Sequence, residues 1–198
     1  MLGAFLTPLI GKINDKIRNI FVILITLFTT ILIALLINEV INNGIVTYVF
    51  GGDTTVIGSG TSAYAIRILF EVDGINAFMA LIAAILPLVA VIYSWEFIKK
   101  ETGQDKYYTL ILLMTAGMLG MILTGDLFNF FVFLEITSIA SSALIAYRID
   151  NKLSVQAGFK YIVISTIGAL FVLMAIALLY GQYDALNIAK LADSITFS

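Results

Sequence analysis

The chain has 198 residues, of which 61% are hydrophobic and 12% are charged, and its formal net charge at pH 7 is −2. Soluble domains are closer to half apolar, so this composition predicts an integral membrane protein. There are no cysteines and no histidines, which excludes disulfides, cysteine-ligated iron–sulfur clusters, histidine-ligated haem and the usual zinc sites. We expect no metal and no cofactor in this chain, and no nucleic-acid partner because there is no basic patch.

Long apolar segments follow one another along the chain. A membrane-spanning helix needs about 20 mostly apolar residues. The segments that meet this requirement are 19–40, 75–98, 107–124, 127–147 and 155–180. An apolar stretch at 1–10 has about half the required length, and we expect it to be a shortened first helix. The sequence therefore predicts one all-α polytopic membrane domain with five to six transmembrane helices.

Two segments between and after these spans have a different character. Ile45–Phe50 and Ala65–Val72 are rich in β-branched and aromatic residues, and a stretch rich in Gly, Ser and Thr separates them. This pattern predicts a β-hairpin-like loop outside the membrane. Residues 186–194 are predicted to form a short helix at the membrane interface.

The positive charges are distributed unevenly between the two ends of the predicted helices. The loops 11–18, 99–106 and 148–152 together hold eight of the 11 lysines and arginines. The opposite end holds only Arg67 and Lys190. Because basic loops remain on the cytoplasmic side, we expect a multi-pass protein of the cell membrane whose three basic loops are cytoplasmic.

A very short connection joins two of the spans. Only Thr124, Gly125 and Asp126 separate the apolar segments on either side, which predicts a tight turn with Asp126 as the N-cap of the next helix. Gly117 and Gly120 precede this turn on one helix face and predict a surface for close helix packing.

Glu135 lies in the middle of the predicted helix 127–147. Inserting an acidic side chain at that depth costs roughly 2.5–3.5 kcal/mol, and such residues usually mark ion pathways. Ser138 and Ser142 follow at i+3 and i+7, so hydroxyl groups continue along the same helix face. We expect Glu135 to exchange protons along a path of hydroxyls and water. The alternative is a buried glutamate that hydrogen-bonds to a neighbouring helix and serves packing.

Lys160 is the second ionisable residue well inside a predicted helix. Its long aliphatic stem allows the ammonium group to reach the membrane interface. Alternatively, Lys160 pairs with Glu135, because the two helices are consecutive and a short loop joins them. In that case Lys160 would change the proton affinity of Glu135 when the pair separates.

The segment LTGDLFNFFVFLEITSIASSALIAYR resembles the central part of the antiporter-like proton-translocating membrane subunits. That family includes the membrane-arm subunits of respiratory complex I, the D-type subunit of multisubunit Na⁺/H⁺ antiporters and the matching subunit of membrane-bound hydrogenases. The resemblance covers essentially the whole chain, and TGDLFN and FVFLE are its most specific parts.

The resemblance implies roles for particular residues. Glu135 matches the family's glutamate in the fifth helix, which takes part in proton transfer, and Lys160 matches a lysine in the sixth helix. The family's main lysine lies in the seventh helix, and family members usually have many more helices than this chain. The chain is then a fragment, the product of a split gene or a complete short subunit.

These observations lead to three functional hypotheses. The first is a proton or cation translocation subunit of a multisubunit Na⁺/H⁺ antiporter, or of an antiporter-like respiratory complex such as a membrane-bound hydrogenase. The second is a structural subunit of such a membrane arm that conducts no ions. The third is a subunit of a redox-driven oxidoreductase in which catalysis belongs to other chains. The expected partners are other membrane subunits, the lipid bilayer, H⁺ and, as an open alternative, Na⁺.

Overall fold

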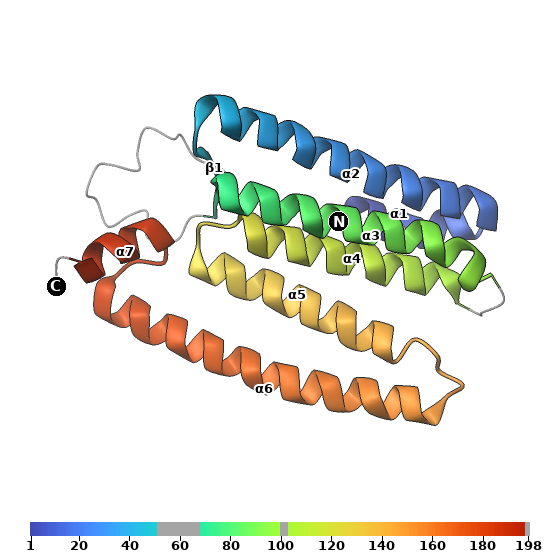
Figure 1. Ribbon diagram of the computed structural model, residues 1–198. Coiled ribbons are helices and arrows are strands. Elements are labelled where there is room, and N and C mark those ends of the chain that lie inside the picture. The colour runs from blue at the N-terminus through green and yellow to red at the C-terminus, as the bar shows by residue number, and fades with distance from the viewer. Residues whose placement is uncertain (51–67, 100–102, 197–198) are drawn as a thin grey trace.

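The computed structural model describes residues 1–50, 68–99 and 103–196. The described residues form seven helices and two strands (Figure 1). In chain order these are α1 (Leu2–Gly11), α2 (Asp15–Asn43), β1 (Val46–Val49), β2 (Leu69–Val72), α3 (Gly74–Phe97), α4 (Gln104–Leu123), α5 (Leu127–Ile145), α6 (Lys152–Tyr183) and α7 (Ile188–Thr196).

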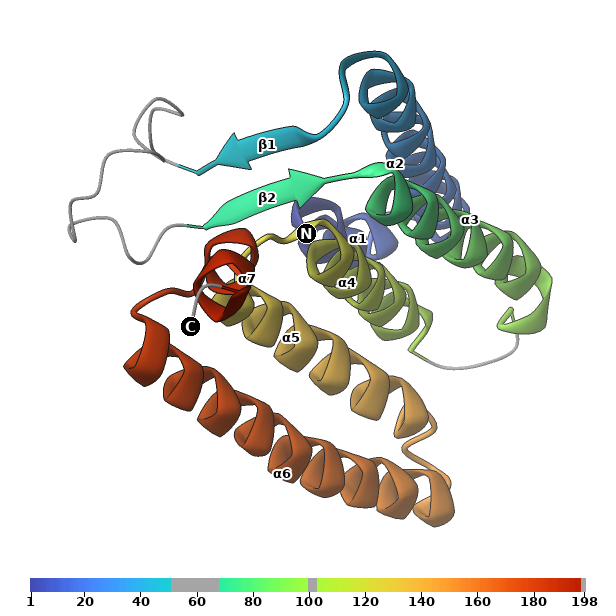
Figure 2. The same cartoon turned by 60° about the vertical axis from the view of Figure 1, so that its left-hand side comes forward.

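The long helices pack in chain order. Helix α2 contacts α3, α3 contacts α4, α4 contacts α5, and α5 contacts α6, while the short α1 packs against α2 and α4. Both views show α5 between α4 and α6, with α6 at the edge of the bundle (Figures 1 and 2). Helix α5, which carries Glu135, therefore has a helical neighbour on each of two sides.

Five of the described helices, α2 to α6, are long and apolar enough to cross a membrane. The predicted fold class, an all-α polytopic membrane protein, is confirmed. Helices α2, α4 and α6 begin three or four residues earlier than the apolar pattern indicates. Asparagines cap two of them: Asn14 accepts a hydrogen bond from the Lys16 N–H at the start of α2, and Asn151 accepts one from the Leu153 N–H at the start of α6. Helix α6 consequently starts at Lys152 instead of 155 and also extends beyond 180.

A small antiparallel sheet lies at one end of the bundle. Strands β1 and β2 lie side by side (Figure 2) and pair in the register Val46↔Val72 to Val49↔Leu69. The described strands agree with the predicted hairpin-like loop, whereas residues 51–67, which include the start of the predicted second strand, lie outside the described residues.

The turn between α4 and α5 is attached to this sheet and to the segment before α7. The Gly125 N–H donates to the Leu69 carbonyl at 2.9 Å, and the Gly125 carbonyl accepts from the Ile188 N–H at 3.0 Å. The Leu127 N–H donates to the Leu186 carbonyl at 3.0 Å. Backbone hydrogen bonds on both sides of the turn thus fix the start of α5.

Asp126 caps α5, as the sequence predicts. Its side chain accepts a hydrogen bond from the Asn129 N–H at 2.8 Å, and the Asn129 amide donates to the Thr124 hydroxyl at 2.9 Å. All three side chains are buried. Burial raises the pKa of Asp126 above its ordinary value of 3.8, although the N–H groups of Asn129 and Phe128 lower it in part.

Arg18 joins three helices at the opposite end of the bundle. The residue is only 1% exposed, although the sequence places it in a basic loop. Its guanidinium donates hydrogen bonds to Asp15 at 2.7 Å, to Asp105 at 2.6 Å and to Gln104 at 2.5 Å. Gln104 in turn donates to the Ile98 carbonyl at 3.1 Å. Arg18 therefore connects the ends of α2, α3 and α4.

We predict that Arg18→Met, which keeps an apolar stem, lowers the free energy of unfolding by about 2–3 kcal/mol, because hydrogen bonds that involve a charged group are lost. Thermal unfolding in detergent micelles measures this effect. Lys99→Met is the matched control, since Lys99 and its partner Glu96 have side chains that are 65% and 83% exposed. We expect the control to change stability by less than about 0.5 kcal/mol. Equal unfolding of both variants would contradict the structural role of Arg18.

Asp126 predicts a pH dependence of stability. Because its pKa is raised in the folded chain, the folded state binds more protons than the unfolded state between the ordinary and the raised pKa. The contribution of Asp126 to the free energy of unfolding is therefore full below pH 3.8 and decreases as the pH rises through its raised pKa. Asp126→Asn removes this titration and retains an oxygen acceptor. We expect the unfolding temperature of the wild type, relative to Asp126→Asn, to fall as the pH rises from acid to neutral. A constant or rising difference would contradict the assignment.

Candidate functional site

Glu135 lies in the middle of α5 and is partly exposed. Within the part of the chain that the structure describes, its carboxyl group has neither a hydrogen bond nor an ion pair. The described residues also contain no group of three or more acidic side chains that could hold a metal ion. Glu135 is therefore a single acidic group in an apolar helix, and its neighbourhood decides what it can do.

Glycines bring α5 close to both neighbouring helices. On the α4 side, a Cβ atom at Gly117 would lie 3.1 Å from the Phe133 carbonyl, and a Cβ atom at Gly120 would overlap the Phe133 ring. On the α6 side, a Cβ atom at Gly158 would lie 2.8 Å from the Ser142 carbonyl and 2.7 Å from the Ala146 Cβ. Replacing a glycine by a larger residue would push α5 away, so these contacts fix which face of α5 meets which helix.

Glu135 lies on the face of α5 that meets α6. It precedes Ser142 by seven residues and Ala146 by eleven, which are about two and three turns of an α-helix. Residues at these spacings share one helix face. Phe133, by contrast, lies about 200° away and meets α4. The carboxyl group is therefore directed toward α6.

The register of the two helices places Ala169 opposite Glu135. Ala146 meets Gly158, and the antiparallel helices continue from that contact in opposite directions along the chain. Glu135 lies eleven residues before Ala146, and Ala169 lies eleven residues after Gly158. Ala169 is only 2% exposed. The carboxyl group thus faces a small, buried side chain.

Hydroxyl groups lie between Glu135 and the loop that joins α5 to α6. Ser138 and Ser142 share the α6-facing side of α5, and the Ser142 hydroxyl donates to the Ile139 carbonyl at 2.8 Å. Ser165 follows Gly158 by seven residues and therefore faces α5. Its hydroxyl donates to the Tyr161 carbonyl at 2.5 Å. A hydroxyl that donates to its own helix still has lone pairs that accept hydrogen bonds from water.

Ser165 is not among the residues that the sequence pattern alone indicates. Its spacing of seven residues from Gly158 was available in the sequence. The contact between Gly158 and α5 gives this spacing its meaning, and that contact is a property of the packing.

The structure does not bring Lys160 to Glu135. Lys160 follows Gly158 by two residues, so its Cα lies about 200° around α6 from the contact with α5. The residue is exposed, and within the described residues no ion pair joins it to Glu135. The register also separates the two residues by nine positions, or about 14 Å along the helix axes.

Comparison with known proteins identifies the relatives of this chain. Residues 124–198, which include α5 and α6, match the family model described as NADH:quinone oxidoreductase/Mrp antiporter, TM. The D-type subunit of the Na(+)/H(+) antiporter of Bacillus subtilis (strain 168) is 28% identical over the whole chain, which covers 38% of that relative. The N-type subunit of the NADH-quinone oxidoreductase of Desulforudis audaxviator is 38% identical over 61% of this chain and 24% of its own length.

Two solved structures are similar to this fold. The membrane-bound sulfane sulfur reductase, an archaeal respiratory membrane complex, contains a chain that is 32% identical with a TM-score of 0.84. The match covers 96% of this chain and 37% of that chain. The Mrp complex from Dietzia sp. DQ12-45-1b has a TM-score of 0.73 at 18% identity, over 95% of this chain and 19% of that one, and shows the fold alone. The chain thus spans about two-fifths or less of the relatives it matches.

Proposed function

We propose that this chain, a homologue of antiporter-like membrane subunits, translocates protons or other cations as part of a multisubunit membrane complex. The complex is a Na⁺/H⁺ antiporter or an antiporter-like respiratory complex. The observation that carries the proposal is the position of Glu135 in the interface between α5 and α6, inside the segment that matches the family model. No packing requirement explains an acidic side chain there, since the residue opposite is an alanine.

In this proposal Glu135 takes up and releases the transported proton. Ser138, Ser142 and Ser165 line the same interface and would hold water molecules between Glu135 and the end of the bundle that carries the basic loops. The protein contains no histidine, the usual titrating side chain near neutral pH. In this proposal, water molecules and hydroxyl groups therefore carry the proton to and from Glu135.

In this proposal Lys160 does not form a direct ion pair with Glu135. Its side chain lies on the outward face of α6, where lipid or another helix would cover it. At an axial separation of about 14 Å and an effective dielectric constant of about 20, a lysine and a glutamate still interact by about 1 kcal/mol. We propose that Lys160 acts on Glu135 through this longer-range attraction, and that the strength changes when the face of α6 is covered or exposed.

The proposed setting is the cell membrane, with the loops at 11–18, 99–106 and 148–152 in the cytoplasm. The proposed partners are other membrane subunits. The transported ions are H⁺ and, in the antiporter alternative, Na⁺.

A second candidate function is a structural subunit that conducts no ions. Two observations favour it: the Ser142 and Ser165 hydroxyls donate to carbonyls of their own helices, and Lys160 faces away from the interface. In that case Glu135 serves helix packing, and other chains carry the ions.

Glu135→Gln separates the two candidates. The substitution keeps the size of the side chain and removes the titratable proton, so we expect transport by the intact complex to fall by at least about tenfold. Proton uptake driven by a cation gradient in inverted membrane vesicles measures transport, and native gel electrophoresis measures assembly. Glu96→Gln is the matched control, because Glu96 is exposed outside the α5–α6 interface and should leave transport unchanged.

If Glu135→Gln transports at the wild-type rate, the proposed role of Glu135 is wrong. If this silent variant also assembles normally while deletion of the chain dissociates the complex, the structural function is supported instead.

A further inference from the structure

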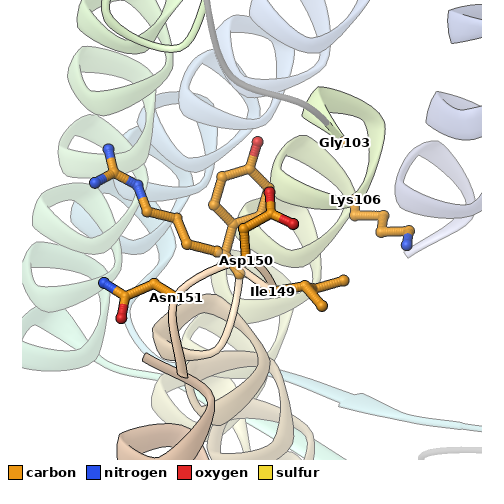
Figure 3. A pocket seen from close by; sticks show the side chains of 7 residues that line it. Gly103, Lys106, Ile149, Asp150 and Asn151 are labelled. Carbon is orange, nitrogen blue, oxygen red and sulfur yellow. The ribbon is translucent and has the colours of Figure 1, made fainter. Parts of the chain in front are cut away.

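A polar cavity of about 520 Å³ lies at the end of the bundle that carries the basic loops. The start of α4 and the loop between α5 and α6 form its wall (Figure 3). The lining residues are Gly103, Lys106, Tyr147, Arg148, Ile149, Asp150 and Asn151. The cavity is separate from the candidate proton site, because Tyr147 lies twelve residues, or about 18 Å along the helix direction, beyond Glu135.

The wall of the cavity presents charges of both signs. Lys106 and Asp150 are exposed and line the cavity from opposite elements, the lysine from α4 and the aspartate from the loop. In the view of Figure 3 the Lys106 side chain extends away from the Asp150 carboxylate. Neither Lys106 nor Asp150 forms an ion pair with a described residue. Arg148 adds a second positive charge to the wall.

The cavity lies at the level where three helices leave the apolar layer. Helix α4 begins at Gln104, α5 ends at Ile145 and α6 begins at Lys152. The rings of Tyr107 and Tyr147 contact each other here with centroids 5.4 Å apart, and tyrosines are enriched at membrane interfaces. A molecule in this cavity would therefore have its polar part at the depth of lipid headgroups.

Apolar side chains continue from the cavity toward the bilayer. Ile149 and Leu153 are 68% and 73% exposed, and Ile145 is 39% exposed. Exposed isoleucine and leucine side chains next to a charged cavity provide a surface for acyl chains. The polar wall and this apolar surface together match the two parts of a phospholipid.

We propose that the cavity binds the headgroup of a phospholipid that carries both a phosphate and a primary amine, as in phosphatidylethanolamine. Lys106 binds the phosphate, and Asp150 accepts hydrogen bonds from the ammonium group. A quaternary ammonium group has no N–H to donate to Asp150, and a glycerol headgroup has no positive charge. The cavity therefore selects phosphatidylethanolamine over phosphatidylcholine and phosphatidylglycerol.

Native mass spectrometry of the full chain, purified in the assembly in which it occurs, tests the selection. The assembly is exchanged into detergent with equal amounts of the three lipids, and the lipids retained are counted. We expect phosphatidylethanolamine to be retained about two- to fivefold more than the other two lipids, the range that exposed ion pairs provide.

Two substitutions distinguish the parts of the site. Lys106→Gln should lower the retention of all three lipids, since each carries the phosphate. Asp150→Asn should abolish only the preference for phosphatidylethanolamine. Lys12→Gln and Asp193→Asn are matched controls, because both residues are exposed and neither lines the cavity. Equal retention of the three lipids by the wild type, or unchanged retention in both cavity variants, would overturn the proposal.

The same headgroup chemistry exists in soluble phosphoethanolamine. If soluble phosphoethanolamine at millimolar concentration displaces the retained lipid completely, the site binds the free compound and the lipid assignment is wrong. Retention that resists the soluble compound supports the lipid, because only the lipid also contacts Ile149 and Leu153. A protein segment that crosslinks into the cavity in the intact assembly and excludes lipid would also overturn the proposal.

Discussion

The close approach of α5 to both of its neighbours is the constraint on which the rest of the structure depends. Gly117 and Gly120 of α4 contact α5 on one side, and Gly158 of α6 contacts it on the other. Because glycine has no side chain, the backbones of the neighbouring helices come into direct contact at these positions. In lipid the hydrophobic effect between helices is weak, so this close van der Waals packing holds the helices together. The three glycines therefore determine the rotation of α5, and that rotation directs Glu135 toward α6.

The two ends of the bundle hold this rotation in place. At one end the turn around Gly125 is hydrogen-bonded to β2 and to the segment before α7, so the first residue of α5 is fixed in space. At the other end Arg18 ties α4 to α2 and α3 through Asp105 and Gln104. These hydrogen bonds hold α4 in place, and α5 packs against α4. The cavity beside Lys106 lies outside this framework, where loops of mixed charge meet the level of the lipid headgroups.

The spans and the position of Glu135 could be predicted because the bilayer imposes simple rules on length and polarity. The arrangement of polar side chains around Glu135 could not. Arg18 is near a helix end in the sequence, yet its burial depends on Asp105, 87 positions away. The depth of Lys160 in its helix follows from counting residues and made a pair with Glu135 plausible. The direction of its side chain around the helix axis follows from the contact of Gly158 with α5, which the sequence does not reveal. The same contact gives Ser165 its place in the interface.

The proposed role of Glu135 depends on which face of α6 lies against Glu135 and its hydroxyl neighbours. The chain contains no cysteines, so pairs of introduced cysteines can be oxidised in native membranes without background. Ser138→Cys with Ser165→Cys should form a disulfide, because both positions lie in the interface at the same level. Ser142→Cys with Lys160→Cys is matched in level but should remain reduced, since Lys160 faces away from α5 and disulfides require Cα atoms within about 7 Å. Rapid crosslinking of the second pair and none of the first would contradict the proposed orientation of Glu135 toward the hydroxyl-lined face of α6.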